Sequence, residues 1–134
     1  MKNSDRKLLR QELVAVVRDL PEPVIDEMAI PSYTHWNPLI RWLMWKRLAV
    51  VQQICSSSTV DTAVDFGTGS GVMLPFLSRM SSRVIAIDKC TEPARRLCEA
   101  RALRNVHVHF ADGTSMPLPK EERKSLFVWT FSNT

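Results

Sequence analysis

Hydrophobic residues recur at helical spacing near the start of the chain and predict a first helix with one apolar face. That face is made of Leu9, Leu13, Val16, Val17 and Leu20. Ser4 precedes it as a candidate N-cap. The segment "LPEP" at 20–23 predicts the end of this helix, because proline disfavours helical geometry in the residue before it. The segment 29–38, which holds two prolines, predicts a loop.

A second helix is predicted from about Pro38 to Cys55, and its pattern is unusual. Its three cations, Arg41, Lys46 and Arg47, fall at separate angles around the helix, with apolar side chains between them. This mixture predicts a helix that is covered on more than one side. Packing in the core explains it, and so does a lid over a ligand pocket, with flat apolar area from Trp36, Trp42 and Trp45. A helix lying on a membrane surface fits less well, because it needs a cleaner polar face.

After the linker Ser56–Thr59 the pattern changes to alternating strands and helices. Buried strands are predicted at Val60–Phe66, Ser82–Asp88 and Val106–Phe110, with a fourth near the end at 125–131. Helical patterns at 71–80 and 91–104 separate the first three, with Thr91 as a candidate cap. Strand–helix–strand alternation predicts a parallel sheet with right-handed crossovers. The fold class is therefore α/β, a partial Rossmann-like sheet of about four strands at 60–134 behind an N-terminal helical extension at 1–59.

The third strand, "VHVHF", alternates strictly between apolar residues and histidines. His107 and His109 fall on one face, and Val106, Val108 and Phe110 fall on the other, which indicates a strand at the edge of the sheet. Two histidines at this spacing also suit a metal ion, but no third ligand is evident in the sequence. We therefore favour a solvated edge.

Composition narrows the class of protein only modestly. The 134 residues are 45% hydrophobic, which suits a single domain with a real core. The net charge of +4 is spread evenly, without the basic arm of a dedicated nucleic-acid-binding protein. Three cysteines without metal-ligand spacing indicate thiols in a reducing compartment. The charged N-terminal segment lacks the apolar stretch of a signal peptide, and no window resembles a membrane span, so we expect a cytoplasmic protein.

The segment "VDFGTGSG" holds the candidate chemistry. Gly67, Gly69 and Gly71 stand where the first strand ends and its helix begins. Unpaired N–H groups and the helix dipole favour an anionic group at such a junction. We therefore expect a ligand to lie so close to this backbone that side chains are excluded at all three positions.

Three kinds of ligand use such a turn. A nucleoside triphosphate needs Gly-Lys at the end of the loop, which is absent here. A dinucleotide turn places its third glycine one residue later, where this chain has Val72. Asp65, two residues before the first glycine, faces a pyrophosphate unfavourably but suits a ligand that carries an ammonium group beside its carboxylate.

The segment resembles motif I of class I S-adenosylmethionine-dependent methyltransferases, which reads apolar-Asp/Glu-apolar-Gly-x-Gly-x-Gly. The resemblance implies that S-adenosylmethionine is the cofactor. In it, Asp88 binds the ribose hydroxyls, with Lys89 and Cys90 alongside the adenosine, and Asp112 in "FADGTSMPLP" reads the adenine edge beside Gly113. The resemblance also implies that residues of the first motif bind the methionine end of the cofactor: Asp65, Gly67, Thr68, Gly69 and Gly71. A nicotinamide-dependent oxidoreductase stays open as a weaker alternative, because it also uses an acid at the position of Asp88.

The resemblance covers residues 60 to about 119 and implies further features. Many small-molecule methyltransferases have a helical extension before motif I, which implies that Tyr33, His35 and Trp36 lie near the cofactor or the acceptor. The family's sheet has seven strands and this chain has about four, so we expect a chain truncated after the fourth strand. The expected activity is methyl transfer to a small molecule; the alternative is a non-catalytic fragment or interaction module. An apolar fourth strand left unpaired predicts association with a second copy.

Overall fold

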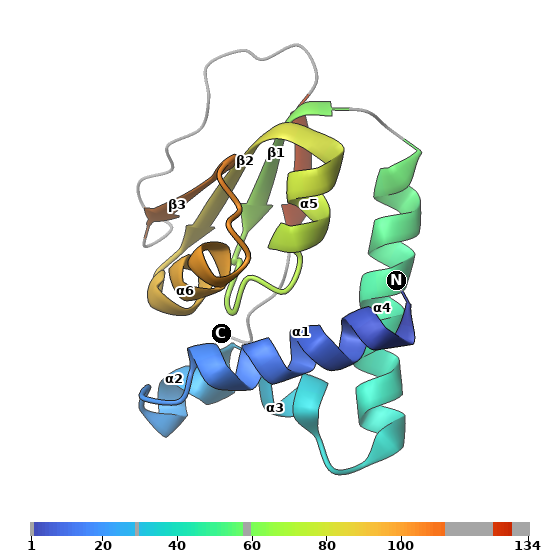
Figure 1. Cartoon of the computed structure of the whole chain (residues 1–134), viewed down its shortest axis with the longest axis vertical. Coiled ribbons are helices and arrows are strands. Elements are labelled where there is room, and N and C mark those ends of the chain that lie inside the picture. Colours follow the sequence, from blue (N-terminus) through green and yellow to red (C-terminus); the bar gives the residue numbers. More distant parts are fainter. Residues whose placement is uncertain (1, 29, 58–59, 112–124, 130–134) are drawn as a thin grey trace.

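The computed structural model of the chain describes residues 2–28, 30–57, 60–111 and 125–129, the last range by its backbone alone (Figure 1). Four helices come first, and strands and helices then alternate. The elements are α1 (Asn3–Val16), α2 (Glu22–Glu27), α3 (Ile30–Thr34), α4 (Pro38–Ser56), β1 (Val60–Phe66), α5 (Leu74–Met80), β2 (Ser81–Asp88), α6 (Glu92–Ala100), β3 (Val106–Phe110) and β4 (Ser125–Trp129).

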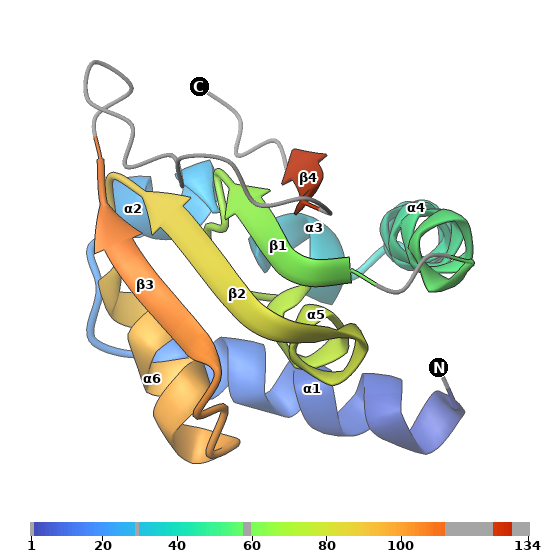
Figure 2. The same cartoon turned by 90° about the horizontal axis from the view of Figure 1, so that it is seen from above.

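The strands form one parallel sheet in the order β3-β2-β1-β4, so the predicted α/β, Rossmann-like fold of about four strands is confirmed. Helices α5, α6 and α1 lie on the same side of this sheet (Figure 2). The core between them contains fully buried side chains from every layer, among them Leu13, Leu74, Leu77, Val84 and Leu97. Burial of each large apolar side chain contributes about 1.5–3 kcal/mol.

The N-terminal region contains two helices more than the pattern predicts, α2 and α3. Residues Ile30–Thr34, expected in a loop, form the short helix α3, which tolerates Pro31 because the first turn of a helix needs no N–H there. The apolar face of α1 is confirmed, but α1 ends at Val16, before the prolines. Ser4 is not its cap: the helix begins at Asn3, and the Asp5 carboxylate accepts the Lys2 backbone N–H at 3.3 Å.

Helix α4 agrees with its predicted bounds, and Asn37 caps it by accepting the Leu39 N–H at 2.9 Å. The prediction that it is covered on more than one side is wrong. Only Trp45, Leu48 and Cys55 are buried, and Trp45 packs edge-on to Tyr33 of α3. The opposite face keeps its apolar side chains exposed, because α4 stands beside the sheet and packs mainly on α3 (Figures 1 and 2).

The edge position predicted for β3 is confirmed, because β3 stands at one end of the strand order, next to β2. His107 and His109 are exposed there, and within the described residues no group of three or more His, Cys, Asp or Glu side chains could hold a metal ion. At the other edge lies β4. The association of β4 with a second copy stays a prediction, because the structure describes only the backbone of β4.

The three cysteines carry thiols, as expected. Cys55 is buried, and Cys90 and Cys98 are half-buried. Burial raises the pKa of Cys55, and burial together with the charge of Glu99 raises the pKa of Cys98 to about 11. Both thiols therefore stay protonated and unreactive near neutral pH.

An ion pair joins α1 to the end of α6. Both Nε and Nη2 of Arg101, which follows α6, donate to one Glu12 carboxylate oxygen of α1, at 2.8 and 2.6 Å. The two side chains are only 21% and 22% exposed, so solvent screens the pair weakly. The pair therefore helps to hold α1 against α6.

Replacing Glu12 by glutamine is expected to lower the free energy of unfolding by about 1–2 kcal/mol, because Arg101 then loses a charged partner in a half-buried site. Urea unfolding measures this loss. The matched control is Glu92→Gln, which removes an exposed partner of Arg96 and is expected to cost less than about 0.5 kcal/mol. Equal losses in the two variants would show that the Glu12–Arg101 pair does not stabilise the contact between α1 and the sheet domain.

Candidate functional site

The glycine turn, residues 67–71, connects β1 to α5 and is almost completely buried. Thr68 is 3% exposed and Ser70 is 2% exposed. The Gly67 N–H donates to the Ile87 carbonyl of β2 at 2.9 Å, which folds the start of the turn onto the neighbouring strand. All three glycines have positive φ, of 72°, 52° and 80° along the chain. The turn therefore lies at the carboxyl ends of two adjacent parallel strands, where ligands of open α/β sheets bind.

Several N–H groups of the turn are used within the chain, so fewer are left for a ligand than the sequence led us to expect. The Gly69 N–H donates to Asp88 at 2.8 Å and the Gly71 N–H to the Thr68 carbonyl at 2.8 Å. The Leu74 N–H donates to the Gly71 carbonyl at 2.9 Å. The reason is that α5 begins only at Leu74, three residues later than predicted, and the residues before it form tight turns that use their own donors.

Gly71 is explained by packing inside the chain and needs no ligand beside it. A Cβ on Gly71 would lie 3.0 Å from Cδ1 of Leu74, 3.3 Å from Cα of Ala94 and 3.4 Å from Cδ2 of Leu97. The last two residues belong to α6, so the glycine allows the turn to contact that helix. Packing and the positive φ therefore suffice to exclude a side chain at Gly71, and contact of a cofactor with this residue stays a prediction.

Gly69 meets a residue that the sequence did not single out. A Cβ on Gly69 would lie 3.8 Å from the Cα and carbonyl oxygen of Met28, an ordinary contact. Met28 directly follows α2 and is 6% exposed. Helices α2 and α3 lie across the carboxyl ends of the strands in both views (Figures 1 and 2). The N-terminal extension therefore covers the glycine turn, a long-range contact without a local sequence signal.

Asp65 lies beneath the turn on β1 and is fully buried. The Thr68 hydroxyl donates to its Oδ2 at 2.6 Å. A buried carboxylate favours positively charged or hydrogen-bond-donating groups nearby. Asp65 and Thr68, both predicted at the methionine end, are therefore brought together.

Asp88 is the last residue of β2, and it connects the end of this strand to the glycine turn. Its Oδ2 accepts the Gly69 N–H at 2.8 Å and its Oδ1 accepts the Cys90 N–H at 2.9 Å. The residue is 8% exposed. Each carboxylate oxygen has a second lone pair, so two hydroxyl donors can still be accommodated.

Of the remaining predicted residues, the structure describes Lys89 and Cys90 but not Asp112 and Gly113. Lys89 is exposed and Cys90 half-buried, both directly after Asp88. The Ala111 N–H donates to the Asp88 carbonyl at 3.1 Å, which brings the end of β3 beside the site. Asp112 and Gly113 lie outside the described residues, so their roles stay predictions.

Of the three N-terminal residues expected near the site, Tyr33 is buried and the other two lie further toward solvent. Burial raises the pKa of Tyr33 to about 12, against the opposing effect of the Arg47 charge and with a smaller rise from Asp65. The position of Tyr33 near the cofactor stays a prediction. His35 stacks on Trp36, which is 83% exposed.

The raised pKa of Tyr33 has a consequence for stability. The unfolded phenol ionises near pH 10, whereas the folded one ionises near pH 12. Stability from Tyr33 is thus fully present below pH 10 and is lost as the pH rises to 12, by about 2–3 kcal/mol. Tyr33 is the only tyrosine, so phenolate absorbance reports its ionisation directly. Ionisation of the folded chain near pH 10, or an unchanged loss of stability in Tyr33→Phe, would contradict this expectation.

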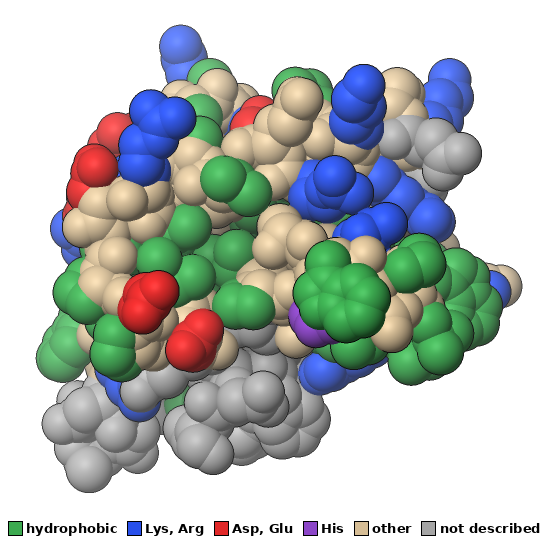
Figure 3. Space-filling model, turned by 90° about the horizontal axis from the view of Figure 1, so that it is seen from below, with side chains coloured by type: hydrophobic (Ala, Val, Ile, Leu, Met, Phe, Trp, Pro, Cys, Tyr) green, Lys and Arg blue, Asp and Glu red, His purple; other side chains and the backbone are tan. Residues whose placement is uncertain are grey.

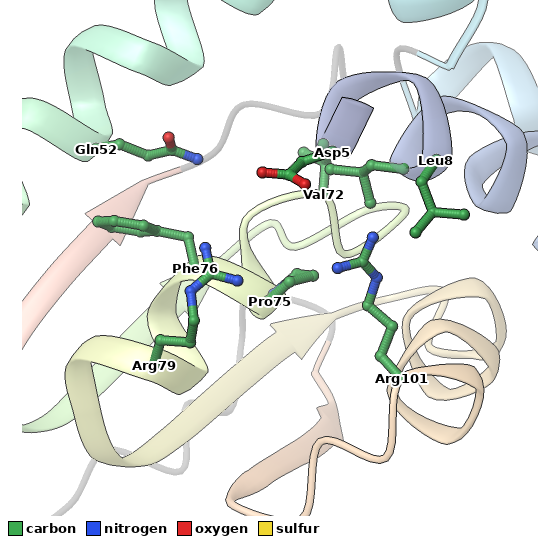
Figure 4. Close-up of a pocket in the computed structure, with 9 residues that line it drawn as sticks. Asp5, Leu8, Gln52, Val72, Pro75, Phe76, Arg79 and Arg101 are labelled. Carbon is green, nitrogen blue, oxygen red and sulfur yellow. The ribbon is translucent and has the colours of Figure 1, made fainter. Parts of the chain in front are cut away.

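A separate pocket of about 360 Å³ lies between α1, α4 and α5. Figure 4 shows Arg79 and Arg101 reaching into it, with Asp5 and Leu8 on α1, Gln52 on α4 and Phe76 on α5 around them. Arg101 is already paired with Glu12, and neither Asp65 nor Asp88 lines the pocket. We therefore keep this pocket apart from the site of the glycine turn.

Comparison with known proteins agrees with this geometry at the level of the fold. No protein-family model matches the chain, and no curated protein matches it. Among solved structures, the YcgJ protein of Bacillus subtilis matches 63% of this chain over 37% of its own, with a TM-score of 0.56 and 17% identity. A dimethyladenosine transferase from Plasmodium falciparum matches 71% of this chain over 32% of its own, with a TM-score of 0.54 and 19% identity.

The third structure is coclaurine N-methyltransferase, bound to N-methylheliamine and S-adenosylhomocysteine. It matches 92% of this chain over 50% of its own, with a TM-score of 0.52 and 16% identity. The chain thus has the partial Rossmann-like fold of S-adenosylmethionine-dependent methyltransferases. It spans between 32% and 50% of the length of the two transferases.

Proposed function

We propose that this chain is the cofactor-binding part of an S-adenosylmethionine-dependent methyltransferase. The observation that carries the proposal is the hydrogen bond from the Gly69 N–H to Asp88 Oδ2. It unites a glycine turn and a strand-end carboxylate at the carboxyl ends of adjacent parallel strands, β1 and β2. Together with the buried Asp65, this arrangement supports a ligand that carries hydroxyl groups and a positive charge.

The residues present fit such a cofactor. Asp88 keeps two lone pairs for the two ribose hydroxyls after accepting its two backbone N–H groups. Asp65, with Thr68 at 2.6 Å, provides negative charge for the ammonium group of the methionine end. Asp112 and Gly113 are proposed to contact the adenine, on the resemblance alone. Met28, which is buried, lies beside Gly69 on the N-terminal side of the site, and Tyr33 is proposed to lie near the cofactor on the resemblance alone.

The bound cofactor supplies an activated methyl group on a sulfonium. Transfer is an in-line displacement, which depends on alignment more than on an acid or a base. The role of this chain's residues is therefore to hold and orient, by hydrogen bonds from fixed backbone and carboxylate groups. We propose a small molecule as the methyl acceptor, and we assign no catalytic residue.

A second candidate is a non-catalytic module that binds the cofactor weakly or not at all. One observation favours it: both Asp88 oxygens and the Gly69 and Gly71 N–H groups already have partners within the chain. Met28 also lies in contact range of Gly69. A chain that satisfies its own motif folds without a ligand.

Calorimetric titration with S-adenosylhomocysteine, with NAD as the control, tests the proposal. Saturable binding of S-adenosylhomocysteine alone is the expected result. Binding of NAD alone would assign the chain to the nicotinamide-dependent oxidoreductases. Absence of both, in a chain whose circular dichroism shows it folded, would favour the non-catalytic module. Transfer of a labelled methyl group to small-molecule acceptors then tests turnover separately.

A further inference from the structure

Helix α4 and the residue pair before it present a largely apolar surface to solvent, which we call the outer face of α4. Its large apolar side chains are 43–83% exposed: Trp36, Leu39, Trp42, Leu43, Val50 and Ile54. Lys46 and Arg47, both exposed, lie among them, because they stand three or four positions from Leu43 and Val50. Scattered exposed apolar residues are common, but a contiguous group of this kind marks an interaction surface.

The end of this surface is held in place by specific contacts. The Arg41 guanidinium donates to the carbonyl oxygens of His35 and Trp36, at 2.5 and 3.2 Å. The His35 ring stacks on the Trp36 ring with centroids 5.6 Å apart, and its Nδ1 accepts the Asn37 N–H at 3.0 Å. Trp36 is therefore fixed in an exposed position, which reduces the conformational entropy lost when it binds a partner.

Every charged side chain of α4 is a cation. Between Glu27 and Asp61 the chain contains no acidic residue, whereas Arg41, Lys46 and Arg47 all fall in that interval. Figure 3 shows this mixture on the lower side of the molecule, where hydrophobic and basic side chains gather side by side. A surface that combines tryptophan, aliphatic and basic side chains without acids is complementary to an anionic, partly apolar partner.

We propose that the outer face of α4 binds the surface of an anionic lipid bilayer. The sequence pattern alone disfavours this contact because the helix has no clean polar face, but in the structure α3 covers one side of α4 and the outer face is the side presented to solvent. Trp36 and Trp42 insert at the level of the headgroups, where amphipathic aromatic rings are favoured. Leu39, Leu43 and Val50 reach the acyl boundary, and the stem of Lys46 extends its ammonium group to the lipid phosphates. No described helix is long and apolar enough to cross a membrane, so the contact lies along the surface.

The same charges disfavour a second copy of the chain as the occupant. In a two-fold symmetric contact each residue faces the same patch of its partner. Lys46 and Arg47 would then approach the partner's cations with no acid of α4 between them, and like charges in close contact are destabilising. An anionic bilayer instead attracts the same cations.

Cosedimentation of the full chain with vesicles tests the proposal. We expect binding to phosphatidylcholine vesicles that contain phosphatidylserine, weak binding to phosphatidylcholine alone, and release by salt. Lys46→Glu is expected to lower the partition coefficient roughly tenfold, because one attractive charge becomes repulsive. Trp42→Ala is expected to lower it by a similar factor, about tenfold, through lost apolar burial.

Matched controls lie on α1. Leu8 and Leu43 are 52% and 53% exposed, so Leu8→Ser is the partner of Leu43→Ser, and Lys7→Glu is the partner of Lys46→Glu. We expect only the α4 variants to lose binding while all variants keep the circular dichroism of the parent. No binding to anionic vesicles, or equal loss in the α1 variants, overturns the proposal. A dimer in sedimentation equilibrium that Leu43→Ser dissociates would assign the outer face to self-association instead.

Discussion

Replacing Gly71 by alanine is expected to lower the free energy of unfolding by about 2–4 kcal/mol. The backbone at Gly71 has φ of 80°, a conformation that costs an L-residue about 1–2 kcal/mol. The new methyl group would also lie 3.3 Å from the backbone of Ala94 and 3.0 Å from Leu74, and such overpacking costs about 1–3 kcal/mol more. Urea unfolding monitored by tryptophan fluorescence measures the loss.

Gly69→Ala is the matched control for this experiment. Gly69 also has positive φ, of 52°, but a Cβ there would meet Met28 only at 3.8 Å. Its cost is therefore expected to be that of the backbone conformation alone, about 1–2 kcal/mol. If both variants lost the same stability, the close contact between Gly71 and α6 would not explain the third glycine of the motif.

The second large effect is expected on cofactor binding. Asp88→Ala is expected to weaken the binding of S-adenosylhomocysteine by about 1–3 kcal/mol, roughly 5- to 150-fold, because hydroxyl groups lose a charged acceptor. The same change leaves the Gly69 and Cys90 N–H groups without their partner, so stability also falls. Calorimetric titration below the unfolding temperature of the variant separates the two effects.

Two variants make the Asp88 experiment specific. Asp61→Ala removes an exposed carboxylate at the other end of the sheet, at the start of β1, and is expected to leave affinity unchanged. Asp88→Asn keeps one oxygen acceptor and is expected to lose less affinity than Asp88→Ala. Unchanged affinity in a folded Asp88→Ala chain would remove Asp88 from the site.

The sheet was predictable because its strands are short apolar runs bounded by loops and by charged or small residues. Both β1 and β3 begin and end where the pattern places them, and β2 begins one residue earlier. The position of the candidate site was predictable for a related reason. Asp65 and Asp88 end adjacent parallel strands, so their positions in the sequence bring them to the same edge of the sheet.

The predictions that failed concern contacts between distant segments. The burial of α4 depends on which elements stand beside it, and its side-chain pattern alone cannot separate a covered face from an exposed one. Helix α3 has only five residues, too few for a periodic signal, and it is stabilised by packing against α4.

The sequence by itself therefore determined the strands, their parallel direction and the acids at their ends, because these follow from local hydrophobic patterns and chain direction. Only the tertiary structure decided what each glycine contacts. Gly71 lies against α6 and Gly69 near Met28, across 23 and 41 positions of the sequence respectively, counted from Gly71 to Ala94 and from Met28 to Gly69. Such contacts depend on how whole helices pack, and packing is decided by the fit of surfaces that no local pattern encodes.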